Sequence, residues 1–470
     1  MTAPAARAQR PGFHTGPGRK RVWPVALVVA AVVTAAYVVF SLRQWARFEV
    51  PSWDLGIFTQ VVRSYAELRA PVSEIKGPGF MILGDHFHPL LAVLAPVYRL
   101  LPSGATLLVL QALLIGVSVL VVTHSAGRHL GRFAGVGIGL AYGLSWGLQT
   151  AVAAQFHEIA LAVPLLAAGC AALVRRDHRA AAWWALPLLG VKETFGLTVA
   201  AIGVVILIRG GRRLGMVLIA VGLTAFVLLT RVVLPALNPD GVWAYASDSI
   251  ISEFLTDPGA ALASLSAGAG QKMLLVLAVL AITGFLAVRS PIAVVLLPTF
   301  AWRLTSDVPS HWSLDWHYSA VLMPVVFLAL VDALRTAPLR RWARWVAAGC
   351  AVAALLLSSQ FPLSALAAPR TYTPAVDDGG AHAALAAVPE GATVATDITL
   401  MAYLAPEATV YWVGNTGNPV PDYVVVDQDS GVYPGGAPED VVAYAEEKFP
   451  GAQFTGVLSR DGFLVARQEG

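Results

Sequence analysis

Long apolar runs, each approaching the roughly 20 residues needed to cross a bilayer core, recur along this chain and restrict its fold more than any other feature. The cleanest run is 22–42. Further runs lie at 104–124, 133–150, 157–174, 180–191, 194–208, 214–236, 271–288, 290–304, 317–334 and 345–364. With 57% hydrophobic and 13% charged residues and a mean hydropathy of +0.66, the chain is too apolar for a soluble globule. We predict a polytopic α-helical membrane protein with about eleven spans.

The first apolar run follows a basic tail, RPGFHTGPGRKR, and could be taken for a signal peptide. However, the run exceeds the hydrophobic region of a signal peptide, about 7–15 residues, and no A-x-A cleavage site follows it before RQWARFEV. We therefore predict an uncleaved span with the N-terminus inside. Residues 1–21, rich in Pro, Gly and Arg, are predicted to form a disordered basic cytoplasmic tail.

Basic residues cluster in short loops between the runs, as the positive-inside rule expects of cytoplasmic loops. The clusters are 128–132, 175–179, 209–213, Arg289 and 335–344. With the N-terminus inside, the predicted spans place every cluster in the cytoplasm. The same count places on the outer, extracytoplasmic side the segments 43–103, 151–156, 192–194, 237–270 and 305–316 and the C-terminal tail. We predict a multi-pass plasma-membrane protein whose transmembrane domain, 22–364, has a large first outer loop, 43–103.

Two segments depart from the pattern of crossings. Residues 88–101 are too short to cross and end at PSG, which predicts an interfacial or re-entrant helix beginning at Pro89. Residues 365–470 contain TVATD, ATVYWVG and DYVVVD, typical of short strands, and the amphipathic PEDVVAYAEEKF. These residues predict a small extracytoplasmic α/β domain with a core of its own.

Charge and cysteine content limit the partners. The net charge is only +3 and the basic residues lie in short loops, a membrane-orientation pattern rather than a nucleic-acid footprint. We expect the lipid bilayer, and no nucleic acid, as a partner. The two cysteines, Cys170 and Cys350, lie within apolar runs and predict no disulfide framework.

Ionisable residues within or beside membrane spans are costly and point to function. On the predicted outer face they are Asp54, Asp85, His86, His88, His157, Glu158, Lys192, Glu193, Asp307, His311, Asp315 and His317. Asp54 is either a loop turn or helix cap, or a general base for an acceptor hydroxyl. Glu158 and Glu193 are weaker candidates for that role, with a Lys192–Glu193 neutralising pair as the alternative. His157 is also explained by a hydrogen bond within the bundle.

The stretch GDHFHP, residues 84–89, has three interpretations. Histidines two apart share a face only in extended backbone, so a metal site would have to recruit further ligands from elsewhere. Asp85 or His88 could instead cap the helix that begins at Pro89. The helix start could also bind an anion, with the histidines as donors to phosphate or in proton transfer.

Three arginines lie near outer ends of apolar segments, where the positive-inside bias disfavours them. They are Arg99, Arg231 and Arg303. A guanidinium fork there suits an anionic ligand such as a lipid phosphate. The alternatives are pairing with a neighbouring carboxylate, or snorkelling toward the interface.

Several motifs together resemble a family of predicted polytopic membrane proteins known as a domain of unknown function, family 2079. They are WDLGIFTQ, GDHFHPLLAVLAPVYRLLPSGATLLVLQ, FHE, VKE, HYSAVLMPVVF, VPEGATVATD and DYVVVD. The resemblance covers most of the chain and implies no established activity.

The layout is more distantly similar to that of GT-C glycosyltransferases. That resemblance implies a GT-C-like helical bundle, a polyprenyl-phosphate-linked sugar donor, and a catalytic acid in the first outer loop. Asp54 occupies the matching position. It stands alone between Trp53 and Leu55, without the paired acidic motif common in that loop.

We therefore predict a glycosyltransferase that moves a sugar from a polyprenyl phosphate, on the outer face, to a glycan, lipid or protein acceptor. The predicted catalytic residues are Asp54, Asp85 and Glu158. Residues predicted to bind substrate or lipid phosphate are His86, His88, His157, Lys192, Glu193, Arg231, Arg303, His317 and Tyr318. The sequence identifies no cofactor, and a divalent metal is compatible with these residues but not indicated by them. A transporter or lipid flippase, and a non-catalytic scaffold that displays its outer domain, are the alternatives.

Overall fold

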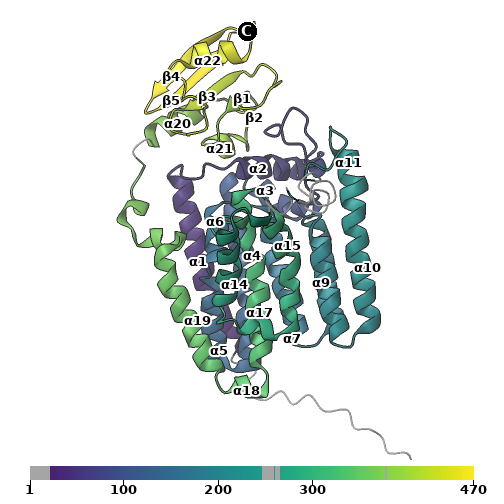
Figure 1. The fold of residues 1–470 in the computed structure, drawn as a ribbon. Coiled ribbons are helices and arrows are strands. Elements are labelled where there is room, and N and C mark those ends of the chain that lie inside the picture. Colours follow the sequence, from purple (N-terminus) through teal and green to yellow (C-terminus); the bar gives the residue numbers. More distant parts are fainter. Residues whose placement is uncertain (1–21, 246–258, 260–264, 376–377, 470) are drawn as a thin grey trace, which may run out of the picture.

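A computed structural model describes residues 22–245, 259, 265–375 and 378–469, so the predicted tail, 1–21, lies outside the described residues. The described chain is a bundle of roughly parallel and antiparallel helices with a small sheet at one end (Figure 1). Among the described residues, five helices are long and apolar enough to cross a membrane. They are Val22–Ala46, Gly104–Leu130, Arg212–Leu237, His317–Leu334 and Ala343–Gln360.

The helices coincide with the predicted apolar runs, because each run ends at a loop with basic or turn-forming residues. The bundle contains α1 (Val22–Ala46), α4 (Gly104–Leu130), α5 (Arg132–Gly143), α6 (Trp146–Ala153), α7 (Ala162–Val174), α8 (His178–Ala185), α9 (Phe195–Ile208), α10 (Arg212–Leu228), α11 (Leu234–Leu237), α14 (Ala269–Ala281), α15 (Leu297–Thr305), α17 (Leu322–Leu334) and α19 (Ala343–Leu357). Several predicted crossings are composite. The run 214–236, for example, is α10, a π-helical turn η6 (Leu229–Val233) and α11.

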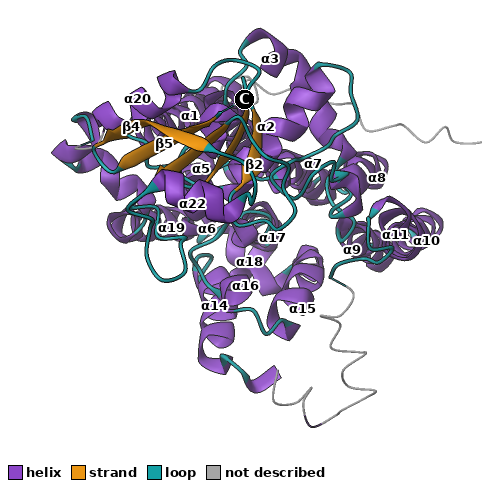
Figure 2. Cartoon of the chain, turned by 90° about the horizontal axis from the view of Figure 1, so that it is seen from above, coloured by secondary structure: helices purple, strands orange, loops and turns teal. Residues whose placement is uncertain are grey.

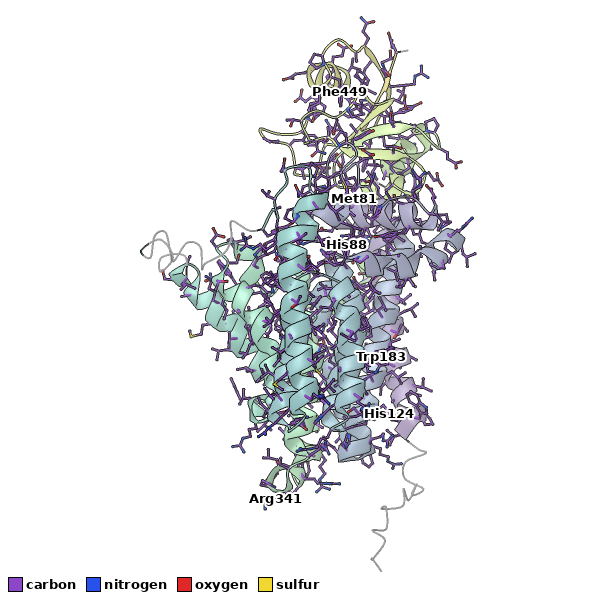
Figure 3. The ribbon with its side chains drawn as sticks, turned by 90° about the vertical axis from the view of Figure 1, so that its right-hand side faces the viewer. Met81, His88, His124, Trp183, Arg341 and Phe449 are labelled. Carbon is purple, nitrogen blue, oxygen red and sulfur yellow. The ribbon has the colours of Figure 1, made fainter. Side chains whose placement is uncertain are left out.

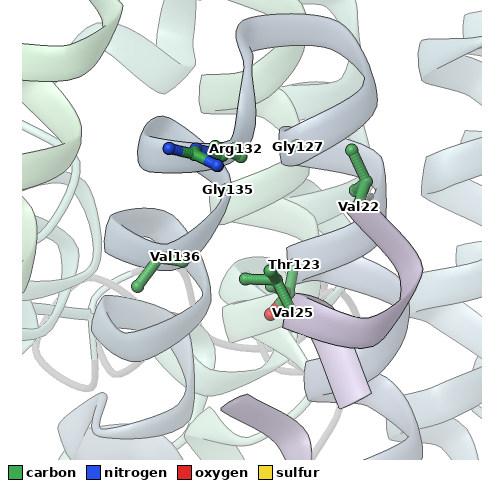
Figure 4. Close-up of a pocket in the computed structure, with 7 residues that line it drawn as sticks. All are labelled: Val22, Val25, Thr123, Gly127, Arg132, Gly135 and Val136. Carbon is green, nitrogen blue, oxygen red and sulfur yellow. The ribbon is translucent and has the colours of Figure 1, made fainter. Parts of the chain in front are cut away.

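Small residues let the bundle helices approach closely. A Cβ placed on Gly135 of α5 would lie only 2.7 Å from the Cα of Gly127 in α4. Figure 4 shows the two glycines facing each other across this contact, beside Val22 of α1. Because helices in lipid associate through packing rather than through a hydrophobic driving force, such contacts hold the bundle together.

Between the bundle and the sheet lie short elements from the predicted first outer loop. They are α2 (Trp53–Ala66), η2 (Ile82–Gly84), η3 (Pro89–Leu94) and α3 (Ala95–Leu100). The segment predicted as an interfacial helix therefore consists of η3 and α3. α2 starts at an N-cap, Ser52, whose side chain accepts a hydrogen bond from the Leu55 backbone N–H at 3.1 Å.

The C-terminal sheet has the order β2-β1-β3-β5-β4. Its strands are β1 (Thr393–Thr396), β2 (Thr409–Trp412), β3 (Tyr423–Asp427), β4 (Phe454–Arg460) and β5 (Phe463–Gln468). The first three are parallel, and β5 is antiparallel to both β3 and β4. The helices around it are α20 (Asp378–Ala387), α21 (Met401–Leu404) and α22 (Val441–Lys448), and the sheet lies over one end of the bundle in the view of Figure 2.

The sheet domain docks on α2. Gln60 of α2 donates to the Val410 carbonyl at 2.8 Å, and Arg63 donates to the Ala405 carbonyl at 3.1 Å. The same Gln60 accepts hydrogen bonds from Ser73 and Ile75 of the following loop. One buried side chain thus links the sheet, α2 and the loop that leads to GDHFHP.

Candidate functional site

The ionisable residues predicted to lie on the outer side of the membrane gather at the end of the bundle that carries the sheet. Figure 3 shows His88 near this end, below the C-terminal domain with Phe449, while His124 and Arg341 lie toward the other end. The residues come from α2, from the turn before η3, and from the segments that precede η4 (Glu158–Leu161), α9 and α17.

Asp54 lies in the first turn of α2, where a carboxylate is favoured by the helix dipole. Neighbouring positions Leu55, Ile57 and Phe58 are buried, whereas the Asp54 side chain is 54% exposed. Its Oδ2 lies 3.3 Å from Nε2 of His157. Burial alone would raise the pKa of Asp54, but the charge and hydrogen bond of His157, together with Lys192 and His86, lower it below the ordinary value.

Both ring nitrogens of His157 face acceptors. Nδ1 lies 3.2 Å from the Gln155 carbonyl, which can only accept, and Nε2 faces the Asp54 carboxylate. Satisfying both acceptors requires a proton on each nitrogen. Asp54 and His157 therefore form an ion pair at neutral pH.

His317 stacks on this imidazolium. The two ring centroids are 3.5 Å apart with an interplanar angle of 25°, and Tyr318 packs against His317 at 4.1 Å. Two stacked rings this close repel strongly if both are charged, so the arrangement favours a neutral His317 beside charged His157. Nδ1 of His317 is buried and has no hydrogen-bond partner among the residues that the structure describes.

Lys192 and Glu193 do not neutralise each other, contrary to one alternative drawn from the sequence. Nζ of Lys192 binds Glu158 at 2.9 Å, and Oε1 of Glu193 lies 2.9 Å from Nδ1 of His86. Burial would lower the pKa of Lys192, but Glu158 and Glu193 raise it above its usual value. Two buried carboxylates thus anchor two cations from separate segments.

The turn GDHFHP is held by Glu193 rather than by capping side chains. Besides His86, Glu193 accepts the Phe87 backbone N–H at 3.1 Å through Oε2. The cap alternative is wrong, because Asp85 pairs with Lys76 at 3.3 Å and His88, although at the N-cap of η3, makes no capping hydrogen bond. The carboxylate of Glu193 therefore occupies hydrogen-bond donors of this turn that were predicted to bind a phosphate.

His88 is buried and T-shaped against Phe58, with ring centroids 5.7 Å apart. Burial lowers the pKa of His88 to about 4, so the ring is neutral at physiological pH. Its Nδ1 has no partner within the described part of the chain. His88 therefore cannot supply positive charge, although it can donate or accept one hydrogen bond.

The arginines singled out in the sequence lie apart from these pairs. Arg231 is exposed in η6, and Arg99 is exposed in α3. Arg303 of α15 is fully buried and donates to the His311 and Ser313 carbonyls and to the Ser319 hydroxyl. It thereby shapes the loop that presents His317 and Tyr318, and its hydrogen bonds go to two carbonyls and a hydroxyl rather than to a carboxylate.

Two residues of the cluster have no distinctive signal in the sequence. Lys76 pairs with Asp85 and lies over the Trp53 ring at 5.6 Å. Tyr245 stacks on His86 with ring centroids 4.5 Å apart and an interplanar angle of 9°. The one available hint for Lys76 is that it is the lone lysine of the first outer loop. Nothing in the sequence distinguishes Tyr245.

The described residues do not assemble a metal centre. Among them, no group of three or more His, Cys, Asp or Glu side chains is placed to hold a metal ion. The acids of the cluster face cations instead. The arrangement is suited to proton transfer and to binding an anionic group beside paired charges.

Two comparisons match known proteins. A family model described as "Predicted membrane protein (DUF2079)" matches residues 43–440. No curated protein sequence matches. Among solved structures, the crystal structure of ArnT from Cupriavidus metallidurans bound to undecaprenyl phosphate is similar, with a TM-score of 0.54 and 16% sequence identity over 94% of this chain and 97% of that chain. ArnT has the GT-C fold, so the predicted resemblance in fold is confirmed.

Proposed function

Because the chain belongs to the DUF2079 family of predicted membrane proteins, whose description names no activity, we propose its function from the geometry of the polar cluster. We propose that it is a glycosyltransferase that moves a sugar from a polyprenyl phosphate to an acceptor hydroxyl on the outer face of the membrane. The shared fold with ArnT, which was crystallised with undecaprenyl phosphate, supports this class of lipid carrier.

One observation carries the proposal: the carboxylates of the cluster differ sharply in exposure. Asp54 is 54% exposed, whereas Asp85 is 12%, Glu158 is 4% and Glu193 is 0% exposed. A general base must reach the proton that it removes. Asp54 is therefore the base in this proposal, and the other carboxylates position cations.

In the proposed reaction the acceptor oxygen attacks the anomeric carbon of the donor sugar. The bond between that carbon and the phosphate oxygen breaks, and its electron pair leaves with the polyprenyl phosphate. Asp54 takes the acceptor proton, and His157 keeps the carboxylate ionised until then. The lowered pKa of Asp54 ensures the carboxylate form at neutral pH.

The released phosphate needs positive charge nearby. Lys192 supplies it and His86 offers a ring nitrogen as a hydrogen-bond donor; each remains partly exposed although paired with a buried carboxylate. His317 and Tyr318, packed beside His157, would line the sugar or phosphate position. A site of fixed, paired charges can stabilise developing charge without reorganising at the moment of reaction.

The proposal includes a topology. We take the sheet end of the bundle as extracytoplasmic and the end with the basic loops as cytoplasmic, in a plasma-membrane protein with about eleven crossings and the C-terminal domain outside. The positive-inside rule supports this orientation, because arginines from all the basic loops line one cavity at the opposite end. Labelling single introduced cysteines with a membrane-impermeant reagent in whole cells tests it.

The enzymatic test uses purified protein in nanodiscs with a panel of undecaprenyl-phosphate-linked hexoses and membrane extract as acceptor, with released undecaprenyl phosphate as the readout. Asp54→Asn should lower the transfer rate by about 10²–10⁴-fold, the usual contribution of a positioned base. Binding of undecaprenyl phosphate itself should persist, because Lys192 and His86 are unchanged.

The matched control is Asp240→Asn, which alters an exposed acid next to Asn238, outside the cluster. It should leave transfer at the wild-type rate. Unchanged transfer by a well-folded Asp54→Asn protein would refute the role of Asp54. Absence of transfer and of undecaprenyl phosphate binding in the wild type would refute the function itself.

A further inference from the structure

A cavity of about 900 Å³ opens at the end of the bundle opposite the polar cluster. Its wall is formed by the ends of α4, α9 and α17 and by the loops that follow α7 and precede η8 (Pro291–Leu296). Arginines from each basic loop line it: Arg128, Arg176, Arg209, Arg289, Arg335 and Arg340. Figure 1 shows this end, near α18 (Ala337–Arg340), farthest from the sheet.

The cavity carries a large excess of positive charge. Among the described residues that line it, the one carboxylate is that of Asp332, which is already bound by Arg209 and by the Ser290 hydroxyl at 2.7 Å and lies 3.7 Å from Arg335. For Arg128, Arg176, Arg289 and Arg340, no ion pair is found within the described part of the chain. Residues 1–21, outside that part, contain no Asp or Glu.

Two of the arginines are fixed in place by the end of α7. Arg209, whose side chain is 4% exposed, donates to the Leu173 carbonyl, and Arg335 donates to the Val174 carbonyl. These carbonyls belong to the last turn of α7 and lack partners within the helix. The guanidinium groups are therefore held by backbone and by Asp332 before any ligand arrives.

Arg176 is placed at an energetic cost. Its N–H bonds the Leu173 carbonyl at 2.9 Å, and the N–H of Asp177 bonds the Ala172 carbonyl at 3.0 Å, which is a Schellman motif. The left-handed position of this motif usually holds glycine, yet Arg176 occupies it with φ of 60°. A residue with a Cβ is strained there relative to glycine. The side chain of Arg176 lines the cavity.

We infer that this cavity binds the phosphate of a multiply charged anion. Clustered guanidinium forks match phosphate oxygens in bidentate geometry, and the cavity has the volume of a small-molecule site. The inference is independent of the proposed transfer reaction, which takes place at the other end of the bundle. The phosphate comes either from a lipid headgroup of the adjacent leaflet, beside the apolar wall of Ile208 and Pro291, or from a free phosphorylated molecule.

The experiment uses the full-length protein with two probes: inorganic pyrophosphate in neutral detergent, and nanodiscs of phosphatidylcholine with or without phosphatidic acid. Thermal stability and calorimetric titration report binding. The test variant is Arg128→Gln with Arg289→Gln, since both side chains are exposed. Its control is Arg179→Gln with Arg213→Gln, which removes equal charge from exposed positions of the same basic loops outside the cavity.

We expect a bound probe to raise the Tm of wild type and control, and its affinity to fall at least about tenfold in the cavity variant. A response to pyrophosphate identifies free phosphate as sufficient, and a response only to phosphatidic acid identifies a lipid headgroup. If neither probe acts on the wild type, or if cavity and control variants respond alike, the inference is wrong. Arg340→Gln provides a second variant should the double variant fail to fold.

Discussion

At the sheet end of the bundle, Asp54, Glu158 and Glu193 each lie beside a cationic or protonatable side chain, whereas at the opposite end six arginines line a cavity in which Asp332 pairs with only two of them, Arg209 and Arg335. The two groups differ in whether the protein supplies the counter-charge. Where it does, charges are fixed and neutralised within the fold. Where it does not, the counter-charge must come from solvent ions or from an external anion.

This difference predicts opposite responses to mutation. In the balanced cluster, removing one partner leaves a charge that is buried and unpaired, which is expensive. In the basic cavity, removing one arginine relieves repulsion among like charges. The predictions below test that contrast.

The largest effect is expected from Lys192→Met. Nζ of Lys192 neutralises Glu158, whose side chain is 4% exposed, at 2.9 Å. Leaving that carboxylate unpaired should destabilise the protein by about 3–5 kcal/mol. Thermal unfolding of the purified protein measures it. Adding Glu158→Gln to the variant should recover most of the loss, and a double variant as unstable as Lys192→Met would show that the lysine acts through packing.

Asp397 is a buried acid for which the described residues provide no cationic partner, and it sharpens the comparison. Asp397 follows β1 and accepts hydrogen bonds from the Asp427 and Thr399 N–H groups and the Tyr433 hydroxyl. Burial, aided by the charge of Asp427, raises its pKa to about 6. Between the unfolded pKa of Asp397 and about pH 6, this carboxyl is therefore protonated in the folded domain but ionised in the unfolded chain. The proton stabilises the folded domain at low pH, and this stabilisation is lost as pH rises through the folded pKa.

The shift corresponds to about 3 kcal/mol over the whole window, of which about 1.4 kcal/mol lies between pH 7.5 and pH 5. The protection factors of the β1 and β3 amides in the full chain, corrected for the intrinsic pH dependence of exchange, should accordingly rise at the lower pH. Asp397→Asn should flatten this dependence, whereas Glu390→Gln, at an exposed position, should retain it. A slope that survives in Asp397→Asn would assign it to another group.

The helices of the bundle could be predicted from the sequence because apolar length and basic loops are local signals. The run 104–124 lies within α4, and 88–101 corresponds to η3 and α3. The β4–β5 hairpin was missed although Asp461-Gly462 is a typical two-residue turn, and both residues have positive φ. The alternation of apolar and polar residues in β4 and β5 is too weak to identify them as strands on either side of this turn.

The residues of the polar cluster could be predicted, but their partners could not. Glu193 binds His86 across 107 positions of sequence, and neither residue indicates which of the outer cations and anions it will meet. Pairing depends on how α2, α9 and the turn before η3 meet in three dimensions. The adjacent Lys192 and Glu193 favoured a local pair, yet successive residues at this turn point to different neighbours.

A smaller effect is expected from His157→Gln, which removes the counter-charge of Asp54 and keeps a side chain that can hydrogen-bond. Without that charge, burial should dominate and raise the pKa of Asp54. The acid limb of kcat/KM, where activity is lost as pH falls, should therefore move to higher pH. His382→Gln, in the C-terminal domain, is the control. A reduced rate with an unshifted limb would indicate a purely structural His157.

The smallest effect is expected at the basic cavity. Arg128→Gln should change the free energy of unfolding by less than about 0.5 kcal/mol, or stabilise slightly at low salt, because it removes one of several unpaired like charges. Added salt should erase any gain by screening the remaining arginines. Arg209→Gln should behave differently: it removes the close ion pair with Asp332 and one hydrogen bond to the Leu173 carbonyl, so Tm should fall markedly at every salt concentration. If Arg128→Gln were as costly as Arg209→Gln, the cavity would contain a counter-charge supplied by the protein, and the contrast between the two ends would fail.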